Sequence, residues 1–194
     1  MRLHLLRHAI AVPRAGTHYP NDDRPLTEDG RKKMRKAAGG IAAAIGTVDI
    51  IFSSPLKRAL DTARIAAKEL GLAGKITILE ELLPGREPGM LVNALLLGRQ
   101  KESLLIVGHE PDLGVFASTL LGSPALSIVF KKGGLCRIDV DELRTGSTGR
   151  LIYHLTPKQL RLLSPAKQHD RTKPLQKPPL SGPSHRRRRN RRVG

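Results

Sequence analysis

In the segment HLLRHAIAV, a permanent cation, Arg7, and a titratable imidazole, His8, stand side by side at the end of a strand-like run. Similar side chains follow other strand-like runs: Arg58 comes after the second run, and His109 ends the fourth. Arg24 lies in the first long loop, just before a predicted helix. Because the carboxyl ends of parallel strands meet at one edge of a sheet, we expect these groups to converge there. Gathered cations need an anion, and the oxygens of a phosphoryl group match arginine bidentately.

Other chemistries lack their signatures in this sequence. There is no glycine-rich Walker loop, no G-x-G-x-x-G after the first strand and no G-x-S-x-G elbow. The histidines do not have the spacing of zinc ligands, and no cluster of aspartates predicts a magnesium site. We therefore expect neither metal nor cofactor. Arginine and histidine would stabilise the charge, and a histidine would be the nucleophile.

Each of these side chains also has a structural interpretation when it is taken alone. An Arg-His pair at a strand end is commonly a solvated terminus, Arg58 could be an ordinary surface charge, and His109 could cap backbone groups before its helix. The functional interpretation depends on their gathering at one sheet edge. The other histidines singled out receive only the structural interpretation: His4, His18 and His154.

Alternating strand and helix patterns would position the candidate residues. Apolar runs predict strands at 2–7, 48–52, 76–79 and 104–107, and closing strands at 127–130, 135–140 and 151–154. Periodic segments predict helices at 28–45, 55–70, 89–97, 111–121 and 156–163. Thr27 is the predicted N-cap of the first helix, and the serine pair before Pro55 that of the second. This order predicts an α/β fold, a three-layer, doubly wound, mostly parallel sheet with helices on both faces.

The charge distribution separates the chain into two parts. Its 194 residues suffice for one well-buried domain, and the formal net charge of +17 favours anionic ligands. We predict a catalytic domain over 1–164 and a disordered basic tail over 165–194, a stretch with ten of the basic residues and one acidic residue. Its RRRRNRR run is either a solvated terminus or a site of non-specific polyanion binding.

The sequence gives no indication of export or of a membrane partner. Cys136 is the single cysteine and cannot form an internal disulfide, as is typical of a reducing compartment. The first residues do not form a signal-peptide apolar region, and no apolar run approaches the roughly 18 residues of a membrane span. We therefore expect a cytoplasmic protein.

Four short motifs resemble those of a known family. LLRHAIA, RPLTEDGRKKM, SSPLKRALDTA and VGHEPDLG occur in the order and at the intervals typical of the histidine phosphatase, or phosphoglycerate-mutase-like, superfamily. The short chain, the RPLT form and the GHEP form are similar to its small bacterial SixA-type phosphohistidine phosphatase branch. The resemblance spans roughly residues 1–160 and implies a phosphoglycerate-mutase-like fold.

The resemblance also implies roles for individual residues. His8 would be the nucleophile that becomes phosphorylated, and Arg24 a further phosphate contact of the small branch. The phosphoryl oxygens would be held by Arg7, Arg58 and His109. Two positions depart from the pattern. Ala9 replaces the usual glycine after Arg-His, so that this position need not adopt positive φ. Glu81 occupies a place comparable to the general acid of larger members, although the small branch often does without one.

We therefore expect a metal-independent phosphatase that acts through a phosphohistidine intermediate and dephosphorylates phosphohistidine on a protein, as in signal transduction. A leaving imidazole needs less protonation than an alkoxide, and short connections leave the site open to a protein side chain. Two alternatives remain: a phosphomonoesterase of a small phosphorylated metabolite, and a polyanion-binding module with a vestigial site. The intact His8, Arg58 and His109 argue against a vestigial site.

Overall fold

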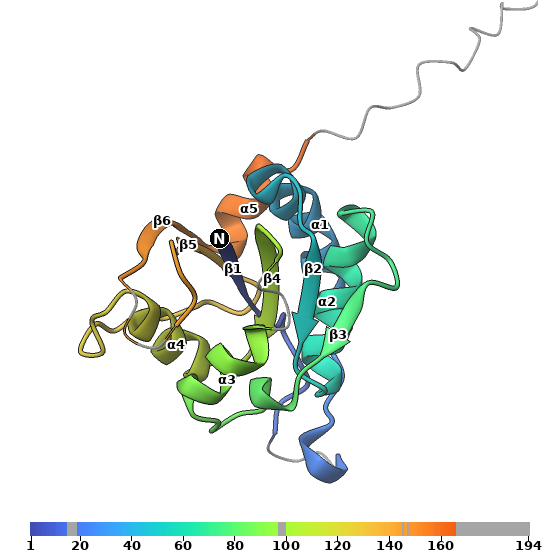
Figure 1. The fold of residues 1–194 in the computed structure, drawn as a ribbon. Helices are drawn as coiled ribbons and strands as arrows, with labels where there is room; N and C mark the ends of the chain where they lie inside the picture. The colour runs from blue at the N-terminus through green and yellow to red at the C-terminus, as the bar shows by residue number, and fades with distance from the viewer. Residues whose placement is uncertain (15–18, 97–99, 145, 147, 166–194) are drawn as a thin grey trace, which may run out of the picture.

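A six-stranded mixed sheet forms the centre of the molecule (Figure 1). The structure, a computed structural model, describes residues 1–14, 19–96, 100–144, 146 and 148–165. The strands are β1 (Arg2–Arg7), β2 (Ile50–Ser53), β3 (Ile76–Ile78), β4 (Ser103–Gly108), β5 (Leu135–Asp139) and β6 (Arg150–Leu155). Their order across the sheet is β3-β2-β4-β1-β5-β6. The first four strands pair in parallel, and β5 and β6 close the sheet with antiparallel pairs.

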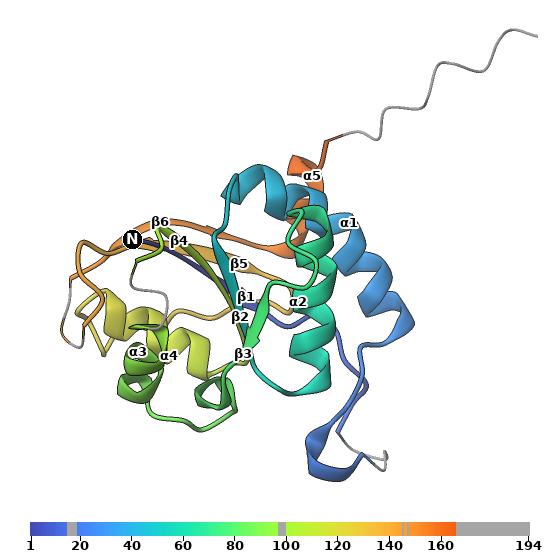
Figure 2. The same cartoon turned by 45° about the vertical axis from the view of Figure 1, so that its right-hand side comes forward.

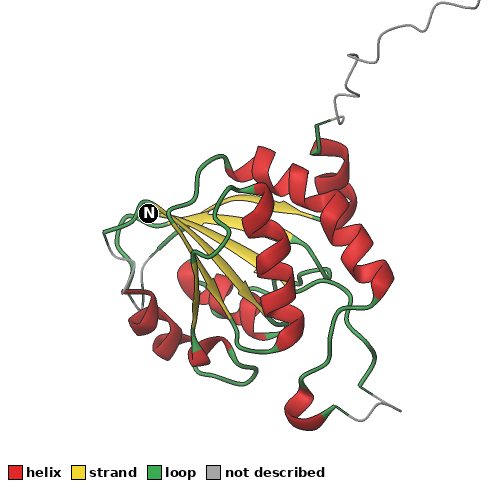
Figure 3. Ribbon diagram, turned by 90° about the vertical axis from the view of Figure 1, so that its right-hand side faces the viewer, coloured by secondary structure: helices red, strands yellow, loops and turns green. Residues whose placement is uncertain are grey.

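Helices cover both faces of this sheet, as predicted. The helices are α1 (Glu28–Ile45), α2 (Lys57–Glu69), α3 (Pro88–Leu95), α4 (Asp112–Leu120) and α5 (Pro157–Leu163), with short 3-10 turns η1 (Pro20–Asp22) and η2 (Glu80–Leu82). In Figures 2 and 3, α1, α2 and α5 lie on one face, while α3 and α4 lie on the other. Each face has its own apolar core, so the predicted three-layer α/β architecture is confirmed.

The central strands are apolar without alternation because both of their faces are covered. All six residues of β4 are buried, and so are the four inner residues of β1. Strands β4 and β1 are neighbours at the middle of the sheet, and their carboxyl ends deliver His109 and His8 to the same edge.

The start of helix α1 and its close contact with α5 each depend on one residue, Thr27 and Gly40. The Thr27 hydroxyl accepts the Gly30 N–H at 2.9 Å, which confirms the predicted N-cap. The helix passes through Gly40 without a break. A Cβ atom there would lie 1.7 Å from the Leu160 carbonyl oxygen, so glycine is what lets α5 pack directly against α1.

The predicted start of the second helix is wrong by two residues. Helix α2 begins at Lys57, and its N-cap, Leu56, makes no side-chain capping bond. The serine predicted to cap it, Ser54, lies outside the helix, where its hydroxyl contacts His109 at 2.8 Å. The hydroxyl keeps only one long local bond, from the Leu56 N–H at 3.4 Å.

The predicted strand at 127–130 is also wrong. Two of its backbone groups are directed toward α4 and the residues before it: the Phe130 N–H donates to Glu110 Oε1 at 3.3 Å, and the Ile128 carbonyl lies where a Cβ of Gly114 would be. Because this segment crosses α4, it lies away from the edge of the sheet. The two other closing strands are confirmed.

The described ranges contain no helix with the length and apolar character needed to cross a membrane. Cys136 is buried with a free thiol. The predicted basic tail from residue 166 onward lies outside the described residues, as does His18, and those predictions stay predictions.

Candidate active site

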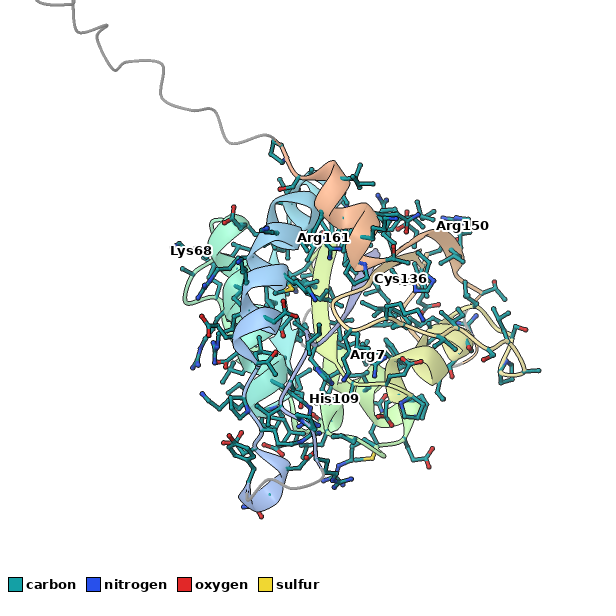
Figure 4. All side chains as sticks on the ribbon, turned by 180° about the vertical axis from the view of Figure 1, so that it is seen from behind. Arg7, Lys68, His109, Cys136, Arg150 and Arg161 are labelled. Atoms are coloured by element: carbon teal, nitrogen blue, oxygen red, sulfur yellow. The ribbon has the colours of Figure 1, made fainter. Side chains whose placement is uncertain are left out.

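The candidate residues lie together at the carboxyl edge of the sheet. Arg7 ends β1, His8 follows it, and His109 follows β4. Arg58 lies in the first turn of α2, directly after β2. These four side chains and Arg24 line one cavity of about 620 Å³. Figure 4 shows Arg7 and His109 at the same end of the sheet.

His8 is held in one orientation and one tautomer. It is 7% exposed, and its backbone N–H donates to Gly108 O at 3.0 Å. Its Nδ1 lies 2.7 Å from the carbonyl oxygen of Ala9, which can only accept, so Nδ1 carries the proton and Nε2 the lone pair. Burial lowers the pKa of His8 to about 4; the bond to Ala9 opposes this, and the cations Arg58, Arg7 and Lys132 add to it. His8 is therefore neutral at pH 7 and can act as a nucleophile.

His109 faces His8 across the site. The two ring centroids are 5.1 Å apart, and His109 Nε2 lies 2.8 Å from the Ser54 hydroxyl. That hydroxyl also accepts the Leu56 N–H at 3.4 Å. Burial, followed by the charges of His8 and Arg58, lowers the pKa of His109 to about 2, so the ring is neutral at pH 7. In the tautomer in which the Ser54 hydroxyl donates to Nε2, His109 carries its proton on Nδ1 and can donate one hydrogen bond from there.

Arg7 is anchored by a backbone carbonyl of the segment that precedes β5. Its Nη1 donates to Phe130 O, and Phe130 in turn donates its N–H to Glu110. Burial lowers the pKa of Arg7, and Glu110 opposes this effect. The guanidinium is therefore held in the lining of the cavity by a segment that crosses α4.

Asp22 holds the two remaining arginines. Arg58, 3% exposed, donates from Nη1 to the Asp22 carbonyl at 2.8 Å and from Nη2 to Oδ2 at 2.9 Å. Arg24 Nε donates to the other carboxylate oxygen at 2.6 Å, while its Nη1 donates to Val12 O. Burial raises the pKa of Asp22, but Arg24 and Arg58 outweigh it, and the net pKa is lowered. The arginines are thus positioned through a permanent carboxylate.

Thr62 connects the nucleophile to the helix that carries Arg58. Its hydroxyl accepts the Ala9 N–H at 3.0 Å and donates to the Arg58 carbonyl at 2.6 Å. The residue after His8 and the first turn of α2 are therefore fixed relative to each other. Such a link matters because phosphoryl transfer depends on positioning within fractions of an ångström.

Comparison with known proteins agrees with this arrangement. The model of the histidine phosphatase superfamily (branch 1) matches residues 3–83. An uncharacterized protein of Picosynechococcus sp. is 32% identical over 174 residues, which are 85% of this chain and 97% of that protein. The protein histidine phosphatase SixA in complex with tungstate has a TM-score of 0.71 at 25% identity, covering 82% of this chain and 99% of that one.

A putative SixA from Agrobacterium tumefaciens has a TM-score of 0.65 at 26% identity, covering 80% of this chain and 97% of that one. The chain belongs to the histidine phosphatase superfamily, in its SixA-like branch. The predicted family and the phosphoglycerate-mutase-like fold are therefore confirmed, and the protein is a phosphatase that uses a histidine.

In this histidine phosphatase, two glutamates, Glu81 and Glu110, line two different cavities, and His109 lines both of them. Glu81, the predicted possible general acid, lines an adjoining cavity of about 240 Å³ that His109 shares. Glu110 lines the larger cavity with His8, and burial raises its pKa. The structure thus places Glu81 in a cavity that His109 also lines but outside the His8 cavity, and its role stays a prediction.

Sequence reasoning missed Asp22, Ser54 and Glu110 as parts of this site. The signals were positional: Asp22 is two residues before Arg24, and Glu110 directly follows His109. Among the described residues, no group of three His, Cys, Asp or Glu side chains is placed to hold a metal ion. The groups that the histidine phosphatase site offers to a ligand are therefore mainly guanidinium and imidazole donors.

Proposed function

We propose that this phosphatase removes the phosphoryl group from phosphohistidine on a protein, without a metal, through a phosphohistidine formed on His8. The observation that carries the proposal is the convergence of one neutral imidazole with Arg7, Arg58 and His109 in a single cavity. The tungstate bound to SixA supports it, since tungstate is a tetrahedral oxyanion like phosphate. The polyanion-binding module with a vestigial site loses support, because the whole constellation is intact.

In the first step, the lone pair of His8 Nε2 attacks phosphorus. The Nε2–P bond forms as the bond to the leaving imidazole breaks, and that imidazole keeps the electron pair and takes up a proton from solvent. Three buried nitrogens of the site have no hydrogen-bond partner within the described ranges: Arg7 Nε, Arg58 Nε and His109 Nδ1. All three belong to groups that can donate to the phosphoryl oxygens, where charge is distributed in the transition state.

In the second step, water attacks the phosphorylated enzyme. The new P–O bond forms as the Nε2–P bond breaks, and the electron pair of the broken bond returns to His8 Nε2. The attacking water gives up a proton to solvent, inorganic phosphate is released and neutral His8 is regenerated. Asp22 is not available as an acid because its pKa is lowered by its two arginines. A substrate whose leaving group needs little protonation suits such a site, and this favours phosphohistidine.

A second candidate has one observation in its favour. Glu110 lies in the His8 cavity with a raised pKa, so it could protonate an alkoxide leaving group. This would suit a phosphomonoesterase of a small phosphorylated metabolite. The two candidates differ in what the Glu110→Gln substitution does: it leaves hydrolysis of phosphohistidine nearly unchanged but slows that of an ester by about 10²-fold or more.

The decisive experiment compares substrates on the full-length protein. A histidine phosphotransfer domain carrying phosphohistidine is assayed beside a panel of sugar phosphates and phosphoserine, each with and without a chelator. We expect kcat/KM to be at least tenfold higher for the phosphoprotein, with no effect of the chelator. A metabolite that is hydrolysed faster than the phosphoprotein, with Glu110 required, would establish the second candidate instead.

The cytoplasmic location belongs to this proposal as well. A phosphohistidine-bearing signalling protein is an intracellular substrate, and the enzyme must meet it there. Cell fractionation with a tagged chain checks the location.

A further inference from the structure

An apolar groove of about 450 Å³ lies on the surface beside the His8 cavity. Its sides are α1, the start of α5 and the segment 131–133 before β5. In Figure 4, α1 and α5 lie next to each other, with Arg161 labelled on α5. The apolar side chains that line the groove are Ala9, Ile10, Met34, Ala37 and Pro157. A groove of this kind is suited to apolar side chains rather than to a phosphate ion.

The rim of the groove is basic, and no acidic side chain is among the residues that line the groove. Lys33 lies on this rim but pairs with Asp29 at 2.7 Å. The other rim cations make no ion pair with any residue that the structure describes: Lys131, Lys132, Lys158 and Arg161. The three lysines among them are exposed, and their charges are available to a partner.

The groove adjoins the catalytic cavity. Lys132 lines both hollows, and its charge is among those that lower the pKa of His8. The N–H of Gly133 bonds to the backbone oxygens of both Arg7 and His8 at 3.1 Å. Ala9, on the groove floor, directly follows the nucleophile. A chain segment seated in the groove would therefore lie directly beside the entrance to the His8 cavity.

The basic rim and the apolar floor of the groove together indicate which kind of ligand would bind there. The chain's own basic segment 165–194 and a second copy of this chain, with its net charge of +17, carry the same sign as the rim. A nucleic acid would match the charge, but no aromatic side chain lines the groove to stack on a base. A small phosphorylated metabolite would leave the apolar floor uncovered.

We propose that this groove, lined by the residues named above, binds a segment of the phosphoprotein substrate in which apolar side chains are flanked by Asp and Glu. This docking role presupposes the proposed protein substrate and adds a recognition surface outside the His8 cavity. The apolar side chains would cover the floor while the carboxylates pair with the rim. Exposed charges act mostly on association, and salt weakens their effect.

The test reverses two rim charges that do not line the catalytic cavity. The double variant Lys131→Glu/Lys158→Glu is compared with Lys75→Glu/Lys101→Glu, a matched control with the same change in net charge. Lys75 and Lys101 are exposed just before β3 and β4, at the opposite end of the sheet. For each protein, kcat/KM is measured with the phosphohistidine-bearing domain and with p-nitrophenyl phosphate, at about 20 mM and about 500 mM salt.

We expect the rim variant to lose about tenfold or more in kcat/KM for the phosphoprotein at low salt, through KM. That loss should shrink at high salt, and p-nitrophenyl phosphate should be turned over within twofold of the wild type. The control variant should keep both activities. The milder pair Lys131→Gln/Lys158→Gln should show a smaller loss of the same kind, which would confirm that charge is responsible.

Three results would overturn the docking role. Equal losses on both substrates would mean that the lysines act on the site in general. Unchanged phosphoprotein kinetics would leave the groove without a part in recognition. Weaker binding of duplex DNA by the rim variant, with unchanged phosphoprotein kinetics, would assign the groove to a nucleic acid. By contrast, wild-type protein that hydrolyses only metabolites would refute the proposed function itself.

Discussion

His4 lies inside strand β1 and His8 directly after the strand, four positions further on, and burial affects both imidazoles in nearly the same way. Burial lowers the pKa of each to about 4, with nearby arginines adding to the effect. Their surroundings differ. His4 is 0% exposed, with Tyr153 OH at 3.3 Å from Nδ1 and no partner for Nε2 among the described groups. His8 lines a cavity together with five arginines and a second imidazole.

A lowered pKa is therefore no mark of catalysis by itself. Any histidine inside an apolar layer loses its proton readily, because burial disfavours the charged form. What distinguishes His8 is a ring nitrogen that a ligand can reach and donors that converge on the same space. His4 has the perturbation without the access, and the predictions below separate the two.

The largest effect is expected from His8→Ala, paired with His4→Leu as its control. Removing the nucleophile should lower turnover by about 10⁴-fold or more and abolish acid-labile phosphoryl labelling, while the fold is retained. His4→Leu should keep turnover within twofold. Steady-state assays and radiolabelling check both variants. Normal turnover in His8→Ala would refute the mechanism.

Arg58 provides the next test, because it is one of the converging donors that distinguish His8 from His4. Arg58→Ala removes a donor to the developing charge and also one of the arginine partners of Asp22, so kcat should fall about 10²–10³-fold. Arg58→Lys should recover little, because an ammonium cannot reproduce the two bonds of the guanidinium to Asp22. Full activity in the lysine variant would reduce Arg58 to a source of positive potential.

The titration of His8 should differ from that of an ordinary imidazole. NMR of its ring protons, assigned with His8→Ala, should give a pKa of about 4 rather than 6.5. Added tungstate or phosphate should raise it, since a bound anion favours the imidazolium. A free-enzyme midpoint near 6.5 would mean that His8 is solvated and not held in the buried tautomer.

His4 should reveal itself in stability rather than in rate. Its pKa is about 4 in the folded protein and about 6.5 in the unfolded chain. Between these values only the unfolded chain binds the proton, so this stabilising contribution is complete above pH 6.5 and is lost as the pH falls toward 4. Urea titrations of His4→Leu should show a fall between pH 7 and 4.5 that is smaller by roughly 1–3 kcal/mol. An unchanged pH dependence would contradict the buried neutral state.

The smallest effect is expected from truncation after Ser164. The described site lies wholly before that residue, so turnover of a small phosphorylated substrate should stay within twofold. Salt-sensitive binding of duplex DNA should weaken, since six arginines are removed from the RRRRNRR run. A large loss of small-substrate turnover would move the predicted domain boundary.

Those features that depend on local chemistry or on parallel-sheet geometry could be predicted from the sequence. Thr27 caps its helix by accepting the N–H of Gly30, only three residues away. A parallel strand that ends in Arg-His must place this pair at the carboxyl edge of the sheet. Ser54 was mispredicted because its actual partner, His109, is distant in the sequence. Asp22 lies in an irregular turn with positive φ, where no periodicity shows that it will meet Arg58.

The apolar segment 127–130 was also mispredicted because its structure depends on contacts with distant parts of the chain. Its composition favours a strand, but a strand needs a partner edge, and the sheet places β5 beside β1 instead. Only the tertiary arrangement reveals that the Phe130 carbonyl is required as the anchor of Arg7.

The position of β1 in the sheet has a consequence for synthesis on the ribosome. Among the described strands, β1 pairs only with β4 and β5, both of which are translated long after it. A nascent chain that ends before β4 already contains His8 and Arg58, but it has no His109 and no neighbour for β1. Long-range pairing of this kind delays folding until the late strands emerge. The first hydrolytic turnover would therefore report that the sheet of a nascent molecule has closed.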